Sequence, residues 1–308
     1  MHRRNSGKKK SVAGSGPARI IIEKFPDRIV GAIHCPGLTY YPAEWESHLE
    51  MKLIMMLLMC HDVSSIKSQH EKFTYQLKDK THHCFPDATI TVSGEDILVE
   101  VKSLKYLLKA KELEKILAIA SALREQRRTY TLITDDQLHP VWTDNAFILM
   151  RCIRWPLKPE VSQHLRTALT EGPRKIGELL AEPQAIASLG DIHAHIAQRQ
   201  LCIDWDQPLT RQSMVSLPDQ PYRGMTYAAL RDSGRFAHLL AEVALGRRPS
   251  DQRLVEVASA LQRPKKGPSP FGFIGGFSPA ELGHLGRAVS KTASRDANQR
   301  AADTDEST

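Results

Sequence analysis

The chain has 308 residues, 41% of them hydrophobic, which is enough for about two packed domains. Its formal net charge of +7 favours a polyanionic partner, although residues 1–10 alone carry five of the positive charges. The five cysteines form no CxxC pair, and the most apolar run, 53–60, is far shorter than the roughly 20 residues of a membrane span. We therefore expect a cytoplasmic protein without disulfides, structural zinc or membrane contact.

The first 17 residues are basic and rich in Ser and Gly, so residues 1–17 are predicted to form a disordered basic arm, with a nucleic-acid-binding role as the alternative. Ordered structure is expected from residue 18, with short strands at 20–22 and 29–33. Residues 44–60 predict a helix that is buried in its second half, because its apolar side chains recur at three- and four-residue spacing.

The next stretch alternates between strand and helix patterns. A tight turn at Ser93-Gly94 is expected to join two of the strands. A leucine-rich pattern predicts a helix at 104–126. The predicted strands are 72–77, 85–92, 96–102, 130–134 and 147–153. Together these elements predict an α/β domain over 18–155, with a mixed sheet flanked by helices.

Two prolines, Pro156 and Pro159, indicate a linker and a second domain at 156–263. Short helices at 161–170, 175–182 and 188–199 and a hairpin from 201–206 and 213–217 predict a small winged-helix-like α+β domain. Residues 264–308 are predicted to be a mostly disordered tail, because Gly, Pro, Ser and charged residues dominate them. A short helix at 279–289 and a partner-binding segment at 272–276 are the two candidates within it.

The chemically informative residues belong to the first domain. Side chains alternate along a strand, so Glu100 and Lys102 share one face while Val99 and Val101 share the other. Asp87 lies 13 positions before Glu100 across a short hairpin, so strand pairing brings its carboxylate towards the same face. Glu50, on a helix packed over the sheet, adds a third carboxylate.

Three carboxylates beside one lysine call for a cation, and hard oxygen ligands favour Mg²⁺, with Mn²⁺ as a substitute. Asp87 and Glu100, with the Val101 carbonyl, are the predicted ligands, and Glu50 completes the site or belongs to a second metal position. Lys102 is predicted to position or deprotonate an attacking water and to offset phosphate charge. The simpler interpretations are a Pro-Asp turn and a solvated Glu-x-Lys ion pair.

Several segments of the first domain also carry a family resemblance. They are Glu46 to Glu50, Gln69, Tyr75, Phe85-Pro86-Asp87 and Val99 to Ser103. Over about residues 25–140 they resemble the catalytic domain of TnsA-like transposon endonucleases of Tn7-like elements, which belong to the restriction-endonuclease-like PD-(D/E)XK superfamily. The resemblance implies catalytic roles for Glu50, Asp87, Glu100 and Lys102.

The resemblance also implies a biological setting. A bacterial, Mg²⁺-dependent DNA endonuclease would cut the 5′ strands at transposon ends, beside a DDE-type transposase that cuts the 3′ ends and an AAA+ ATPase regulator. The alternatives are a restriction or repair nuclease of the same fold and a non-catalytic DNA-binding adaptor. Within the predicted winged helix, the third helix offers only Arg199 as a strong base reader, which favours protein docking there.

Overall fold

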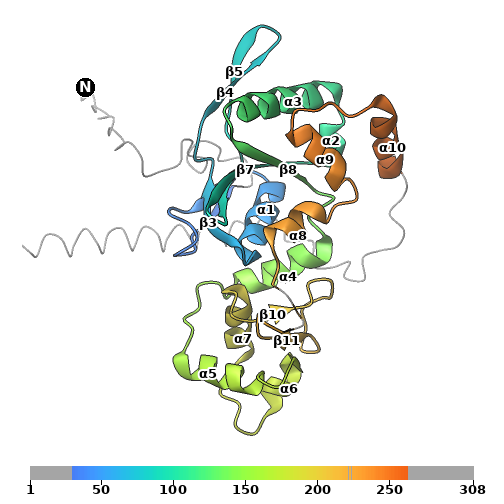
Figure 1. The fold of residues 1–308 in the computed structure, drawn as a ribbon. Helices are drawn as coiled ribbons and strands as arrows, with labels where there is room; N and C mark the ends of the chain where they lie inside the picture. Colours follow the sequence, from blue (N-terminus) through green and yellow to red (C-terminus); the bar gives the residue numbers. More distant parts are fainter. Residues whose placement is uncertain (1–29, 221, 223, 263–308) are drawn as a thin grey trace, which may run out of the picture.

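The structure is a computed structural model that describes residues 30–220, 222 and 224–262. Its upper part is built on a four-stranded mixed sheet flanked by helices (Figure 1), which confirms the coarse α/β prediction. The sheet order is β3-β6-β7-β8, formed by Val63–Ser68, Ala88–Val92, Glu95–Lys102 and Thr129–Thr134. The first three strands are antiparallel, and β8 runs parallel to β7. The predicted arm 1–17, the strand at 20–22 and the tail 264–308 lie outside the described residues.

A helical crossover joins the parallel strands β7 and β8, as parallel pairing requires. It consists of α2 (Leu104–Leu107) and α3 (Ala110–Glu125) rather than the single helix predicted at 104–126. The break falls at Lys109, whose backbone is extended and forms the N-cap of α3.

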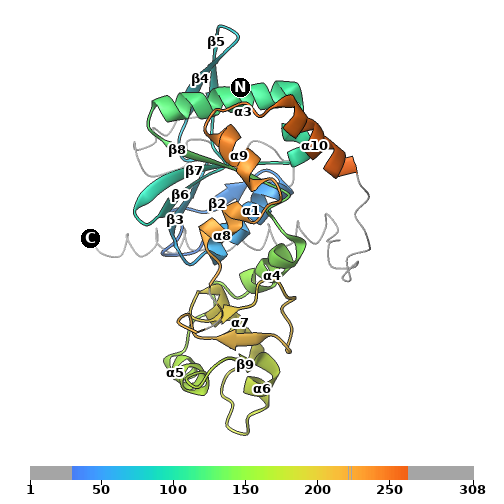
Figure 2. The same cartoon turned by 45° about the vertical axis from the view of Figure 1, so that its right-hand side comes forward.

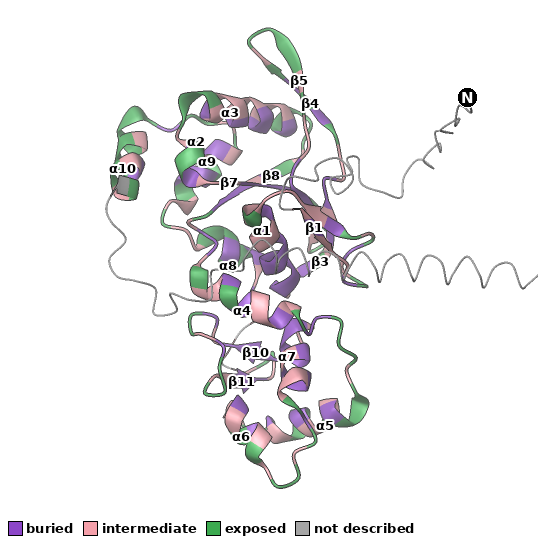
Figure 3. Cartoon of the chain, turned by 180° about the vertical axis from the view of Figure 1, so that it is seen from behind, coloured by how far each residue is buried: buried purple, intermediate pink, exposed green. Residues whose placement is uncertain are grey.

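The two faces of the sheet are covered by different helices (Figures 1 and 3). On one face Ile66, Ile90, Val99 and Val101 share a core with α1 (His48–Met59). On the other, Leu98 and Leu132 share a core with α3 and with α9 (Ala237–Ala244). The central strands β6 and β7 are therefore covered on both faces near the candidate residues, whereas edge strand β3 is partly exposed.

Helix α1 is buried in its second half, as predicted, but it begins at His48 rather than at Glu44. Ser47 caps it: its backbone is extended and its Oγ accepts from the Glu50 N–H at 3.2 Å, an arrangement that favours a helix start at the next residue. The preceding residues form β2 (Ala43–Trp45), which pairs with β1 (Gly31–Ile33).

A β-hairpin formed by β4 (Phe73–Leu77) and β5 (Lys80–Cys84) projects beyond α3 (Figures 1 and 2). The first strand was predicted, whereas β5 was not. The turn residues Lys78 and Asp79 both have positive φ, 52° and 58°, as a two-residue hairpin turn demands. The hairpin leads back to the sheet just before Asp87.

The strand predicted at 147–153 is wrong, because α4 (Pro140–Met150) occupies most of it. A short apolar run has no periodicity that separates a buried strand from a buried helix, and Pro140 at the first helical position is the local signal for a helix. Ala146 and Leu149 face the core that α1 shares with the sheet.

The lower part consists of three short helices and a small antiparallel sheet, in the places the sequence predicted (Figure 1). The sheet order is β10-β11-β9. Strand β9 precedes α6 and was not predicted. The elements are α5 (Pro159–Ala168), β9 (Arg174–Lys175), α6 (Ile176–Ala181), α7 (Leu189–Ala197), β10 (Cys202–Ile203) and β11 (Met214–Ser216).

The segment predicted as one second domain, 156–263, packs in two places: its first part forms the lower part of the molecule, and its later helices pack on the upper part. Helix α8 (Tyr227–Asp232) and α9 return to the upper part, and α10 (Asp251–Gln262) follows them. Leu239, Leu240 and Val243 of α9 join the core of α3 and β8. This return depends on a match between two apolar stripes more than 100 residues apart, which no local pattern reveals.

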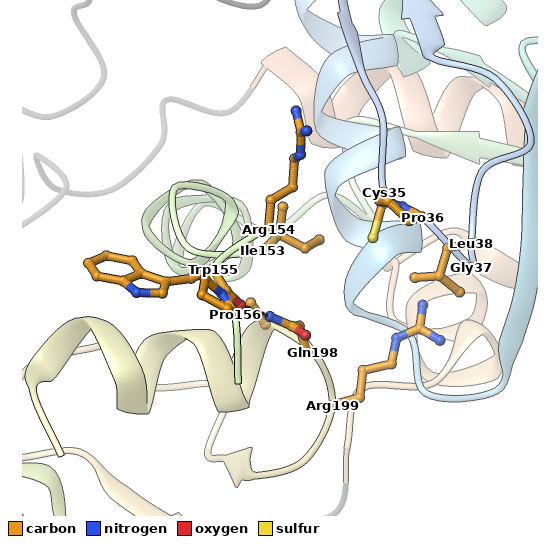
Figure 4. Close-up of a pocket in the computed structure, with 11 residues that line it drawn as sticks. Cys35, Pro36, Gly37, Leu38, Ile153, Arg154, Trp155, Pro156, Gln198 and Arg199 are labelled. Atoms are coloured by element: carbon orange, nitrogen blue, oxygen red, sulfur yellow. Dashed lines mark hydrogen bonds between the residues drawn. The ribbon is translucent and has the colours of Figure 1, made fainter. Parts of the chain in front are cut away.

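The upper and lower parts meet around Arg199 and the linker. The Arg199 guanidinium donates to the carbonyls of Leu58 at 2.9 Å and Val63 at 2.6 Å, at the end of α1. Beside it lies a cavity of ≈ 580 Å³ lined by residues from 35–38, 153–156 and 197–199 (Figure 4). Within the described ranges, no helix has the length and apolar character needed to cross a membrane.

Candidate active site

The predicted site residues gather where β6 begins and β7 ends. Ala88 pairs with Val99 in the antiparallel register, which puts the preceding residue, Asp87, opposite Glu100. Val99 and Val101 belong to the core shared with α1. Alternation therefore directs Glu100 and Lys102 to the opposite face of β7, the one covered by α3.

Lys102 lies between two carboxylates. Its Nζ is 2.5 Å from Glu100 Oε1 and 3.9 Å from Asp87 Oδ2. The Val101 N–H donates to Asp87 Oδ2 at 2.8 Å, which fixes that carboxylate against the end of β7. Asp87 and Glu100 are each only 9% exposed. Burial to this degree separates the cluster from a solvated surface ion pair.

Glu50 approaches from the first turn of α1. The Glu46 N–H donates to Glu50 Oε2 and the Ser47 hydroxyl donates to Oε1, both at 2.9 Å. Because α1 packs against the Val99 side of the sheet, Glu50 reaches the cluster from a different direction than Glu100. Its charge raises the pKa of Asp87, so the two groups interact electrostatically, although the cap is what holds the Glu50 side chain.

The charges of the cluster are unbalanced. Burial raises the pKa of Asp87 well above its usual range, and the Glu100 and Glu50 carboxylates raise it further, against the opposing effect of Lys102. Burial also raises the pKa of Glu50. For Lys102 burial opposes the positive charge, but Glu100, Asp87 and Glu50 outweigh it and raise the Lys102 pKa. The Lys102 ammonium is therefore held protonated, whereas burial and the neighbouring negative charges disfavour the ionised form of Asp87.

The structure also brings three residues to the site that spacing did not single out. The Gln69 N–H donates to the Asp87 carbonyl at 3.3 Å, and Gln69 has a positive φ of 42°. The Tyr130 hydroxyl is buried with no hydrogen-bond partner among the described residues, and after burial itself the charges of Glu100 and Asp87 do most to raise its pKa. Asp135 accepts from the Leu104 N–H at 2.7 Å. Gln69 carried a signal through the family resemblance, and Asp135 carried one as a polar residue directly after β8, whereas Tyr130 carried none.

The candidate site is separate from the cavity in Figure 4, because Glu50, Asp87 and Glu100 are not among the residues that line that cavity. Neither a protein-family model nor a curated protein matches the sequence. Within the part of the chain that the structure describes, no three His, Cys, Asp or Glu side chains are grouped as a ready-made metal site. The chemistry must therefore be argued from the cluster itself.

Proposed function

We propose that this chain is a metal-dependent DNA endonuclease. The observation that carries the proposal is the pair of buried carboxylates, Asp87 and Glu100, beside the half-buried Lys102 on paired strands, with Glu50 electrostatically linked to them. Burying charged side chains is unfavourable unless they are compensated, so a structural role alone is a weak reason to keep two buried carboxylates, Asp87 and Glu100, side by side at the end of a sheet.

The donor set fits a divalent cation. The three carboxylates and one ammonium have a formal charge of −2 when all are ionised, and burial, together with the charges of Glu100 and Glu50, raises the pKa of Asp87. Asp87, Glu100 and the Val101 carbonyl would hold Mg²⁺ or Mn²⁺, with Glu50 completing the site. When bound, the metal would supply Lewis-acid stabilisation of the phosphate, without which phosphodiester cleavage is very slow.

Lys102 acts in this proposal as a hydrogen-bond donor rather than as a base. Its pKa is raised by Glu100 and Asp87, so its ammonium keeps its proton at neutral pH. A protonated lysine stabilises negative charge on the phosphate and orients water through its N–H groups. Of the three roles predicted for Lys102 from the sequence, the proposal keeps the positioning of water and the offsetting of phosphate charge and drops the deprotonation of water.

The biological setting is proposed from the resemblance, with a restriction-endonuclease-like fold for the upper part. The substrate would be DNA at transposon ends, cut on the 5′ strands, with a DDE-type transposase and an AAA+ ATPase regulator as partners. The lower part would be a winged helix, supported by its order α5-β9-α6-α7-β10-β11 and by the central position of β11 in its sheet. Because Arg199 binds carbonyls of the upper part, it is not free to read bases.

The test is strand cleavage of transposon-end DNA by the full chain mixed with the transposase encoded beside it, in Mg²⁺ or Mn²⁺. Asp87→Ala and Lys102→Ala should each abolish 5′-strand cuts and leave 3′-strand cuts. Asp96→Ala and Arg248→Ala are matched controls, because both residues are exposed and lie outside the cluster and outside the lysine-rich hairpin region. Both controls should cut like the wild type.

Two other outcomes would decide between the remaining alternatives. Equal 5′ cutting by wild type and both cluster variants would sink the nuclease proposal and favour a DNA-binding adaptor. Cutting of any duplex without the transposase, lost in both cluster variants, would keep the chemistry and favour a restriction or repair nuclease.

A further inference from the structure

The projecting hairpin of β4 and β5 begins at the candidate site. Its base is the pair Phe73 and Cys84, and the chain then runs through two residues to Asp87. Cys84, at the base of the hairpin, lies close enough to Glu100 to interact with it electrostatically. Burial does most to raise the pKa of the Cys84 thiol, and the negative charge of Glu100 raises it further. Whatever contacts the hairpin is therefore held next to the cluster.

The hairpin has one apolar face and one polar face. Phe73 and Tyr75 are buried in the core that also contains α3. The other face presents Gln76, Thr81 and their neighbours to solvent, and Gln76 Nε2 donates to Thr81 Oγ1 at 2.8 Å. Figure 3 shows the projecting end mostly in the colour of exposed residues. A fixed apolar face makes the polar face a rigid platform.

The surroundings of the polar face are positively charged. Lys72, Lys78 and Lys80 are exposed, Asp79 lies between the last two, and Glu71, just before Lys72, is paired with Arg128. Lys78 Nζ lies 3.5 Å from Glu114 Oε2, which brings the hairpin tip to the first half of α3. The same region carries exposed Lys105, Lys109 and Lys111, and Lys109 Nζ sits 4.0 Å above the ring of exposed Tyr106. Across the hairpin, α2 and the start of α3, six exposed lysines stand against four acidic residues, Glu71, Asp79, Glu112 and Glu114, of which only Asp79 is fully exposed.

We propose that the hairpin enters the major groove of duplex DNA and sets the distance between the base pairs it contacts and the phosphate that is cut. The inference rests on the proposed nuclease function and names how its substrate is held. A major groove is wide enough for a two-stranded ribbon, and the lysines beside it match the phosphate backbone.

The length of the hairpin gives the distance. Each strand has five residues, so the ribbon reaches about 17 Å from base to tip at roughly 3.4 Å per residue. At about 3.4 Å of duplex per base pair, the contacts fall within about five base pairs of the scissile phosphate. Gln76, in the middle of β4, is placed to bind a base edge, whereas Lys78 and Lys80 at the tip are placed to bind phosphates.

The experiment measures DNA binding of the full chain in EDTA by fluorescence anisotropy, over a range of salt concentrations. Lys78→Ala combined with Lys80→Ala should weaken binding to all sequences alike and make the salt dependence shallower by about two phosphate contacts. Gln76→Ala should bind about 5- to 150-fold more weakly to DNA that carries the preferred base at the position Gln76 contacts, and should bind other DNA as the wild type does. Lys67→Ala, on edge strand β3, is the charge control. It should keep the base preference of the wild type and should not show the loss of DNA affinity expected of the Lys78→Ala, Lys80→Ala double variant.

Interference footprinting then locates the base that depends on Gln76, expected within about five base pairs of the cut. Unchanged affinity and salt slope in the hairpin variants, in a protein that cuts DNA, would overturn this inference and leave the nuclease function standing. DNA binding that depends on the hairpin, in a protein that does not cut DNA, would support this inference and overturn the proposed nuclease function. Variants that bind DNA normally but no longer bind the transposase would show a protein-docking hairpin and also overturn the inference.

Discussion

Replacing Arg199 by alanine should destabilise the protein, because this side chain holds the lower part to the end of α1. Its guanidinium contacts three main-chain carbonyls, and two of the contacts, to Val63 at 2.6 Å and to Leu58 at 2.9 Å, are short. Helix α1 has no basic residue in its own last turn, so Arg199 also supplies the cation that favours a helix C-terminus.

The magnitude follows from those contacts. A hydrogen bond from a charged group contributes about 1.5–3 kcal/mol net, so two short ones contribute about 3–6 kcal/mol. The adjoining cavity of ≈ 580 Å³ has room for water that would hydrate the freed carbonyls, which favours the lower end. We expect Arg199→Ala to lower the free energy of unfolding by about 3 kcal/mol, measured by urea denaturation with tryptophan fluorescence.

Two further variants separate the side chain from the backbone. Arg199 has a positive φ of 63°, so Arg199→Gly should be about 1 kcal/mol more stable than Arg199→Ala while losing the same hydrogen bonds. Arg166→Ala is the control, since Arg166 is exposed and its one side-chain hydrogen bond among the described residues, to Gln200, is long at 3.5 Å. An Arg199→Ala protein within about 0.5 kcal/mol of wild type, or one that keeps its stability but loses sequence-specific DNA binding, would refute the reasoning.

The other predictions concern the cluster. Asp87→Asn should raise the stability of the metal-free protein at neutral pH, because it removes a buried, under-compensated charge, yet it should abolish cleavage; equal or lower stability in thermal unfolding would contradict this. The folded-state pKa of Asp87 and of Glu50 is raised, so the folded chain binds more protons than the unfolded one. The contribution of these two carboxyl groups to the free energy of unfolding is therefore largest below the ordinary carboxyl pKa of about 4. It is lost as the pH rises through the raised pKa values of the folded state. Unfolding followed across pH should show this loss without metal, and Mg²⁺ should stabilise more at higher pH. Ser47→Ala should cost about 1 kcal/mol through the lost cap of α1 and should reduce cleavage by freeing Glu50, whereas Tyr130→Phe, which removes a buried unpaired hydroxyl, should not destabilise the fold.

Local patterns in the sequence determined much of this protein. Alternation along 96–102 was enough to put Glu100 and Lys102 on one face, and Ser93-Gly94 marked the turn that pairs β6 with β7; Ser93 and Gly94 indeed have φ of 52° and 85°. The spacing of apolar residues predicted the buried part of α1 and the three short helices of the lower part. Each of these features depends on consecutive residues, whose periodicity is visible in the chain itself.

Tertiary structure alone decided the remainder, because it depends on which distant surfaces fit together. The run 147–153 is apolar in either a strand or a helix, and only packing against α1 distinguishes them. The return of α9 to β8 and the inward turn of Arg199 join segments more than 100 residues apart. Similarly, Glu50 is on a helix that covers the opposite face of β7 from Glu100, so its approach to the cluster depends on how α1 packs on the sheet. Such encounters are determined by the shape and burial of whole faces, which no short stretch of sequence encodes.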